Sequence, residues 1–345
     1  MTETDAVEFS RCHLAPTASS LAAAMGYFDE EFSALPDGIR INAKLGDHSH
    51  EGDRYWMRHA ANAKAMWARS HGADTRALAF SWYESAMPLY ARCSSGVSTP
   101  VDLKGSRIAS IHVAGQKFDY DRTVYLRPFV TSLSSAGLSL SDVEEVAFSV
   151  EREQVRDGSP RQSSFPLQMA RKQIEWLLSG KVDAIASILP PQVVSFLDLR
   201  CIYDPAKDPD PLARVDLRAL VVSGDALRER RDAVVAAVMA ILRAGEWAAQ
   251  HGQEAISLMA ADAHIPEEIL KARKLDAVRA AQIDTSAESI SLMEGRKDFL
   301  LDAGVLEQDF DLAEWTDPSV LEEAIVKLQS RRGTSTVVQR GAAAR

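Results

Sequence analysis

The stretch DPAKDPDPLARVD, at residues 204–216, constrains the fold of this chain more than any other feature of its sequence. It holds three prolines and four aspartates. Proline lacks the backbone N–H group and therefore does not lie inside a helix or a central strand, which makes this stretch a loop. A second turn-rich stretch, GVSTP, lies at residues 96–100. We interpret the two loops as places where the chain crosses between two compact units.

Strand-like and helix-like segments alternate around these loops. Residues 39–45 alternate apolar and polar side chains, which predicts a strand, and residues 75–83 carry a second strand pattern. Residues 53–72 are predicted to form one helix, with Asp53 as its cap. Such an alternation indicates an α/β layer architecture. The last residues, 331–345, show no apolar period and are predicted to form a loose tail.

The order of these segments predicts that one lobe is inserted into another. Residues 98–208 would form the inner lobe, and residues 1–97 together with 209–345 would form the outer one. A chain of 345 residues has the length expected of two domains. Two-lobe α/β proteins place their ligand in the cleft between the lobes, at the carboxyl ends of the strands.

Charge and cysteine content exclude several classes of function. A net charge of −10 argues against nucleic acid or an anionic membrane as the main partner. The amino end lacks the pattern of a secretory signal, and no apolar run reaches the roughly 18 residues of a membrane span. Cys12, Cys93 and Cys201 are too far apart for a zinc spacing and fit reduced thiols. We expect a cytoplasmic monomer that acts on a small molecule.

Four segments occur in an order seen in a known superfamily: MGYFDEEF, VDLKGSRIAS, LLSGKVDAIAS and the helical run that opens with LRALVVSGDAL. In this order the chain resembles the type II periplasmic-binding-protein-like proteins, in their sulfonate, nitrate and thiamine-precursor branch. The resemblance covers most of the chain. It implies a two-lobe α/β fold with an interlobe cleft.

The amino end carries a narrower resemblance. The segment FSRC supplies Ser10 and Cys12 before a proline-containing turn and a helix of small residues, and HSHEGDRYWMR places His48 ten residues before Arg58. These features are similar to those of the aromatic sulfinate desulfinases, which act on 2'-hydroxybiphenyl-2-sulfinate. The resemblance implies that Cys12, His48 and Arg58 are catalytic and that Ser10 assists at the substrate. It also implies that Arg58 enters a helix.

Two departures from the family pattern accompany these matches. Ala60 or Ala61 stands where the family has a glycine pair that brings backbone N–H groups to the sulfinate, so Ala61 is the expected substrate contact. The stretch around Asp53 replaces a family glutamine. A shared reaction on a different substrate is therefore expected. Ser187, at the end of the predicted strand VDAIASI, is a further candidate substrate contact from the inner lobe.

The chemistry of a sulfinate explains why these residue types belong together. Arginine presents a rigid fork of donors that pairs with two anionic oxygens. The Cys12 thiolate would attack sulfur, or its thiol would protonate the ring carbon, and His48 would assist either step as a base. His50 is the rival base. Neither a metal nor an organic cofactor is required.

Each of the three main candidates also has an ordinary structural interpretation. A free cysteine such as Cys12 is usually a small buried side chain, His48 is a polar loop residue, and Arg58 is a solvated helix residue. We therefore carry two functions forward. The first is a desulfinase that hydrolyses the carbon–sulfur bond of an aromatic or related sulfinate and releases sulfite. The alternative is a solute-binding protein for a sulfonate, nitrate or aromatic acid that serves a transporter or a regulator.

Overall fold

Six strands form the main sheet of the computed structural model, in the order β11-β4-β10-β3-β1-β2. The structure describes residues 6–12, 15–46, 53–84, 86–115, 118–151, 161–264, 266–272 and 275–342. The strands of this sheet are β1 (Ala6–Arg11), β2 (Arg40–Leu45), β3 (Trp56–Ala61), β4 (Thr75–Ser81), β10 (Arg218–Ser223) and β11 (Ile283–Asp284).

The register of the main sheet brings several strand ends to one edge. Strand β1 pairs in parallel with β2 and β3, whereas β10 runs antiparallel to both β3 and β4. Arg218, the first residue of β10, therefore lies opposite Ala61 of β3 and Ser81 of β4. The carboxyl ends of β1, β3 and β4 thus meet the start of β10. We call this the carboxyl edge of the main sheet.

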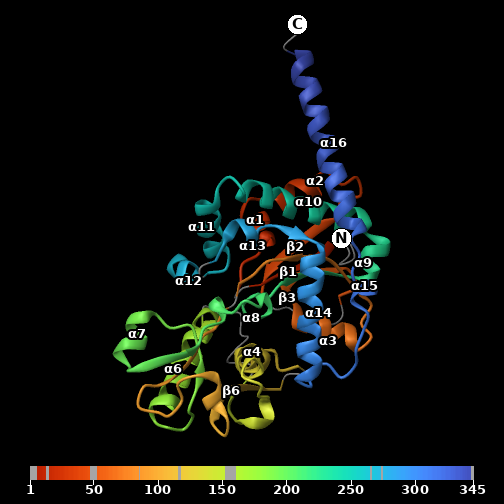
Figure 1. The fold of residues 1–345 in the computed structure, drawn as a ribbon. Helices are drawn as coiled ribbons and strands as arrows, with labels where there is room; N and C mark the ends of the chain where they lie inside the picture. Colours follow the sequence, from red (N-terminus) through yellow and green to blue (C-terminus); the bar gives the residue numbers. More distant parts are fainter. Residues whose placement is uncertain are drawn as a thin grey trace.

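Helices cover both faces of the main sheet (Figure 1). One face carries Phe9, Met57 and Leu220 and packs mainly against the long apolar helix α10. The other carries Phe80 and Val221 and packs with residues of α3, α14 and α15. The helices associated with this sheet are α1 (Ala18–Ala24), α2 (Tyr27–Ser33), α3 (Asn62–Ser70), α9 (Gly224–Glu229), α10 (Arg231–Ala248), α11 (Gly252–Asp262), α12 (Glu267–Ala272), α13 (Ala277–Ala280), α14 (Ala287–Asp302), α15 (Leu312–Trp315) and α16 (Ser319–Ala342).

A second group of strands lies in the lower part of Figure 1, with its own apolar core. Strands β8, β5 and β9 form one ladder, β6 and β7 form another, and a bridge between Ile108 and Ala184 joins the two. The elements of this group are β5 (Leu89–Arg92), β6 (Arg107–Ala114), α4 (Tyr120–Ser135), β7 (Glu144–Glu151), α6 (Arg161–Leu178), β8 (Ile185–Ala186), α7 (Pro191–Phe196) and β9 (Leu199–Tyr203).

The two strand groups correspond to an outer and an inner lobe. The chain passes from β4 to β5, and it returns from β9 to β10 through the proline-rich loop, which contains α8 (Pro211–Arg214). Strand β5 pairs with β8 and β9 and so belongs to the inner group. The limits predicted for the lobes, 1–97 with 209–345 and 98–208, stay a prediction.

Two local predictions are wrong. Residues 53–72 do not form one helix, because Trp56–Ala61 is the central strand β3 and the helix begins only at Asn62. A strand buried on both faces shows no alternation of polar and apolar residues, so its sequence is easily mistaken for part of a helix. The expected loose tail is also helical as far as Ala342, since α16 continues through it. Arg331 pairs there with Glu31 at 2.6 Å.

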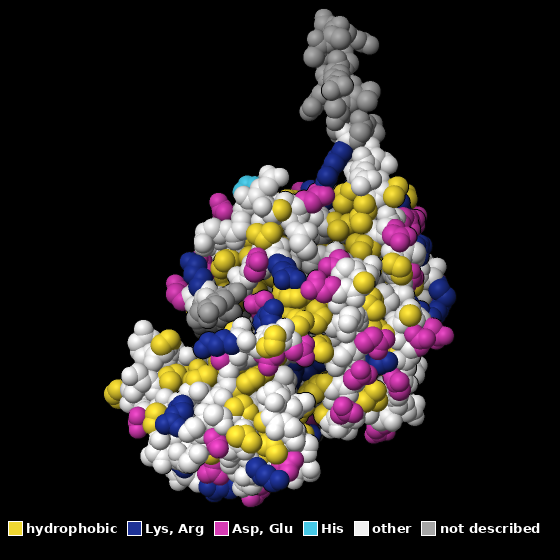
Figure 2. Space-filling model, viewed as in Figure 1, with side chains coloured by type: hydrophobic (Ala, Val, Ile, Leu, Met, Phe, Trp, Pro, Cys, Tyr) yellow, Lys and Arg dark blue, Asp and Glu magenta, His cyan; other side chains and the backbone are white. Residues whose placement is uncertain are grey.

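Basic and acidic side chains lie next to one another over the face drawn in Figure 2. The negative net charge is therefore not concentrated in one patch of this face. Among the described residues, no helix combines the length and the apolarity needed to cross a membrane.

Replacing Asp262 with alanine should destabilise the fold strongly. Arg11 at the end of β1 donates to both carboxylate oxygens of Asp262, at 2.7 and 3.3 Å, and the two side chains are only 7% and 10% exposed. Removing the carboxylate leaves a buried guanidinium without its counter-charge, which costs about 3–5 kcal/mol. Urea unfolding measures this loss. The exposed Asp232→Ala change is the control, with an expected effect below about 0.5 kcal/mol; equal effects of both changes would contradict the account.

Candidate active site

Cys12 follows the last residue of β1 directly, at the carboxyl edge of the main sheet. Its backbone N–H donates to the carbonyl of His59 at 3.2 Å, which fixes it beside β3. Its side chain is half-buried and packs partly against the apolar core of the outer lobe. Ser10, two residues earlier, is buried and lies opposite Arg58 in the sheet register. The structure therefore brings three of the predicted residues to adjacent positions on two neighbouring strands.

Arg58 is a buried strand residue, and the prediction that it enters a helix is wrong. Its Nη1 atom donates to the carbonyl of Ala61 at 3.2 Å, so the guanidinium turns toward the carboxyl edge. Ala61 is the last residue of β3 and is itself buried. A cation held in this low-dielectric position attracts an anion more strongly than an exposed arginine would.

The other predicted residues are His48, His50 and Ser187. His48 and its rival His50 fall outside the described residues. Ser187 directly follows β8 of the inner lobe, is buried, and donates its backbone N–H to the carbonyl of Pro88 at 3.1 Å. The catalytic roles of Cys12, His48 and Arg58 and the substrate contacts of Ser10, Ala61 and Ser187 stay predictions.

Arg218 is a cation of this edge that the sequence analysis missed. It is buried, its Nη1 atom donates to Asp216 at 2.9 Å, and its guanidinium lies 4.3 Å from the ring centre of Tyr83. Burial lowers the pKa of Arg218, but the charge of Asp216 and those of Tyr120 and Cys12 outweigh it and raise that pKa above its usual value. Arg218 is thus fully charged.

Asp216 is the centre of a buried group that we call the Asp216 cluster: Asn62, Arg127, Asp216, Arg218 and Arg296. Asn62 donates to Asp216 at 3.1 Å and to the carbonyl of Leu217 at 2.7 Å. Burial raises the pKa of Asp216, but the charges of the three arginines outweigh this effect and lower the pKa to about 2. Three guanidinium groups thus surround one carboxylate.

The Asp216 cluster holds more positive than negative charge. Burial, assisted by the charge of Arg296, lowers the pKa of Arg127 to about 10. Arg218 Nε and Arg296 Nη1 are buried and have no hydrogen-bond partner among the described residues. The carboxyl edge is therefore a positively charged environment in a protein whose net charge is −10. This field favours an anionic ligand.

His59 is the described histidine nearest to the predicted site, and it is not suited to act as a base. It is completely buried, and its Nε2 atom lies 3.0 Å from the hydroxyl oxygen of Ser81. Burial, together with the charges of Arg218 and Arg58, lowers the pKa of His59 to about 3. His59 is therefore neutral at physiological pH.

A signal for the missed residues was present in the sequence. Asp216 is the last residue of the proline-rich loop, and Arg218 is the first residue of the otherwise apolar strand β10. A charged side chain buried at the start of a strand requires a compensating charge or hydrogen bonds. Such groups are common at functional sites. Their partners Arg127 and Arg296 come from distant helices, which no local pattern reveals.

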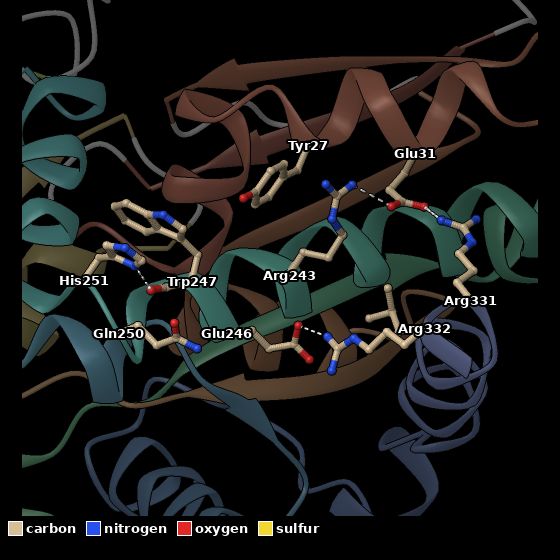
Figure 3. A pocket seen from close by; sticks show the side chains of 10 residues that line it. Tyr27, Glu31, Arg243, Glu246, Trp247, Gln250, His251, Arg331 and Arg332 are labelled. Atoms are coloured by element: carbon tan, nitrogen blue, oxygen red, sulfur yellow. Dashed lines mark hydrogen bonds and ion pairs between the residues drawn. The ribbon is translucent and has the colours of Figure 1, made fainter. Parts of the chain in front are cut away.

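A separate groove lies on the outer face of the outer lobe, where α2, α10 and α16 meet (Figure 3). It has a volume of about 610 Å³. Its arginines are paired with glutamates: Arg243 and Arg331 with Glu31, and Arg332 with Glu246. Because its arginines are paired with glutamates, this groove attracts an anion less strongly than the carboxyl edge does.

No protein-family model matches the chain, and no curated protein matches it either. Several solved structures share its fold. The desulfurization enzyme DSZB is 22% identical over 94% of this chain and 99% of its own, with a TM-score of 0.68. A cysteine-to-serine mutant of DSZB in complex with biphenyl-2-sulfinic acid gives a TM-score of 0.69, with the same identity and coverage.

Sulfonate-binding proteins share the fold as well. The periplasmic aliphatic sulphonate binding protein SsuA from Escherichia coli is 15% identical over 91% of this chain and 92% of its own, with a TM-score of 0.59. The periplasmic sulfonate-binding protein SsuA from Methylobacillus flagellatus KT is 14% identical over 95% and 96%, with a TM-score of 0.68. The predicted two-lobe, type II periplasmic-binding-protein-like fold is confirmed, and both parts of the predicted resemblance are found among its structural neighbours.

The buried neutral state of His59 predicts how stability depends on pH. The unfolded chain binds a proton at His59 below about pH 6.5, whereas the folded chain does so only near pH 3. The contribution of His59 to the free energy of unfolding is therefore fully present above pH 6.5. It falls as the pH drops, by about 2 kcal/mol between pH 6.5 and 4.5. Urea titrations at several pH values measure this decline. His59→Gln should flatten it, and the exposed His112→Gln should not; an unchanged slope in His59→Gln would refute the assignment.

Proposed function

We propose that this protein binds an organosulfur oxoanion at the carboxyl edge of the main sheet and cleaves its carbon–sulfur bond by hydrolysis, releasing sulfite. One observation carries the proposal. Cys12 stands at this edge next to the Ser10–Arg58 pair, and the buried Arg218 lies at the same edge, opposite the last residue of β3. The shared fold with DSZB, which was solved with biphenyl-2-sulfinic acid bound to a cysteine-to-serine mutant, supports the same choice.

Two cations suit the binding of a sulfinate. Arg58 on β3 would engage its two oxygens as a fork, and Arg218 would add its charge from the start of β10. Burial of both guanidinium groups increases their attraction for the anion. The proposal places the sulfinate at this edge with its sulfur atom facing the Cys12 thiolate.

The reaction balances with water as the co-substrate. The Cys12 thiolate attacks sulfur, a sulfur–sulfur bond forms, and the carbon–sulfur electron pair goes to carbon, which takes up a proton. Water then attacks the cysteine-bound SO₂⁻ group and releases bisulfite and the thiolate. The net change is sulfinate plus water to the desulfurised compound plus bisulfite. In this scheme His48 assists the attack of water as a base.

The second candidate function is a solute-binding protein for a sulfonate, nitrate or aromatic acid. The fold likeness to the SsuA proteins favours it, and Ala60 and Ala61 depart from the desulfinase glycine pair. Such a protein would bind an aryl sulfonate and an aryl sulfinate equally without releasing sulfite. We further propose that the protein is a monomer that acts in the cytoplasm, where its three free cysteines would stay reduced.

Cys12→Ser should abolish sulfite release from a panel of aryl sulfinates while leaving the affinity for an aryl sulfonate within about threefold. Serine is nearly the same size but is a much weaker nucleophile at neutral pH. Colorimetric sulfite detection and calorimetric titration measure the two properties. Cys201→Ser, at an exposed position, is the matched control and should retain full activity. Sulfite release that survives in Cys12→Ser would show that Cys12 is not the nucleophile.

Arg58→Lys should raise KM about tenfold and lower kcat less. A lysine ammonium is a point charge and does not reproduce the two parallel hydrogen bonds of a guanidinium. Steady-state kinetics with the best sulfinate of the panel measure both constants, and urea unfolding checks the fold. Arg69→Lys, on α3, is the control with unchanged constants. An unchanged KM in Arg58→Lys would show that Arg58 does not bind the substrate.

A further inference from the structure

We propose that the cavity where α4, the proline-rich loop and α14 meet is a second ligand site, and that it binds an ω-amino acid. Such a ligand is a small unbranched molecule with an acidic oxoanion at one end and an ammonium group at the other. The inference does not rest on the proposed desulfinase activity. It rests on charges of opposite sign that line one cavity at two levels along α14.

The cavity lies between the two lobes and has a volume of about 820 Å³. Helix α4 of the inner lobe, the proline-rich loop with α8, and helix α14 of the outer lobe form its walls, and they lie close together near the centre of Figure 1. Each wall contributes an apolar side chain, namely Val130, Leu212 and Phe299. An added Cβ atom at Gly295 of α14 would lie 2.6 Å from Leu212, so the loop packs tightly on this helix. None of the described residues predicted for the active site lines this cavity.

Buried arginines form the positive end of the cavity. Arg127 and Arg296 both line it, and both belong to the Asp216 cluster. Arg296 is only 5% exposed, and its Nε atom donates to Asn62 at 3.4 Å and lies 3.7 Å from Asp216. Its Nη1 atom is buried and has no hydrogen-bond partner among the described residues. A buried guanidinium with an unused donor, in a cluster with an excess of positive charge, favours an anion, so the acidic group of the ligand belongs here.

The last two turns of α14 form the negative end. Asp298 and Asp302 line the cavity, and both are exposed. They lie four residues apart on the helix, where like charges repel each other. Asp302 is also the last residue of α14, at the negative end of the helix dipole, and the last turn holds no basic residue. An ammonium group beside the two carboxylates would relieve both unfavourable interactions.

The spacing along α14 sets the length of the ligand. Arg296 and Asp302 are six residues apart, which corresponds to about 9 Å along the helix axis. Phe299 lies between these two positions in the sequence, and its ring centre is 4.8 Å from the guanidinium of Arg296. The middle of the ligand therefore meets an apolar surface. 6-Aminohexanoate carries an acidic group and an ammonium group on an unbranched chain of comparable length.

The test is calorimetric titration of the full chain with 6-aminohexanoate, hexanoate and hexylamine. The last two compounds keep the apolar chain, but each lacks one of the two charged groups. We expect saturable binding of 6-aminohexanoate at one site per chain. Its affinity should exceed that of either analogue by about fivefold, because each analogue loses the contact of one charged group.

Two variants assign the binding to this cavity. Asp302→Asn removes one exposed carboxylate and should weaken 6-aminohexanoate by about threefold while leaving hexanoate unchanged. Val130→Trp fills the cavity from α4 and should abolish the binding of both compounds. Asp232→Asn, at an exposed aspartate on α10, is the matched control with unchanged affinities. Urea unfolding checks that each variant folds.

The outcomes decide on the ligand class and on the site. If 6-aminohexanoate does not saturate the protein, or if hexanoate binds equally well, the inference is wrong. Retained affinity in Val130→Trp would place the ligand elsewhere, and should that variant not fold, an unchanged affinity in Asp302→Asn would refute the site. Sulfite release by the unmodified protein is a separate measurement. Its absence would refute the proposed function and leave this inference standing.

Discussion

The buried pair of Asp216 and Arg218 is the interaction on which the rest of the carboxyl edge depends. Burying either charge alone would cost several kcal/mol, and their hydrogen bond at 2.9 Å offsets much of that cost. The pair fixes the start of β10 between β3 and β4, so it also fixes the register of the main sheet at its carboxyl edge. Arg127 reaches the same carboxylate from the inner lobe. Asp216 therefore holds the start of β10 in place, contacts the inner lobe through Arg127 and compensates part of the positive charge.

The same pair explains why an acidic protein has a positively charged site. Asp216 compensates one positive charge, while three arginines of the cluster and Arg58 lie at or near this edge. His59, held neutral by burial, adds no further charge. Cys12 enters this environment from the end of β1, where the sheet register already places Ser10 beside Arg58. A half-buried thiol and two buried cations thus stand at the carboxyl edge of the main sheet.

Much of this arrangement was predictable from the sequence, and the reasons for the failures are physical. The proline-rich loop predicted the crossing of the chain, and the order of segments predicted the two-lobe fold, because both signals are local and strong. Arg58 was assigned to a helix because β3 is buried on both faces, which removes the alternation that identifies a strand. The tail after Arg331 was expected to be loose because its apolar period is missing, yet a helix continues there with ion pairs to α2 and α10. Arg218, Arg127 and Arg296 were missed because Asp216 gathers them from segments far apart in the chain.

The most direct measurement of the central claim is alkylation of the three free cysteines by iodoacetamide, mapped by peptide mass spectrometry with and without a bound aryl sulfonate. Cys12 stands where the anion is proposed to bind, whereas Cys93 and Cys201 belong to the inner lobe, near and on β9. The account predicts that the sulfonate protects Cys12 and leaves the labelling of Cys93 and Cys201 unchanged. Labelling of Cys12 that proceeds at the same rate with saturating sulfonate would contradict the placement of the anion at this edge.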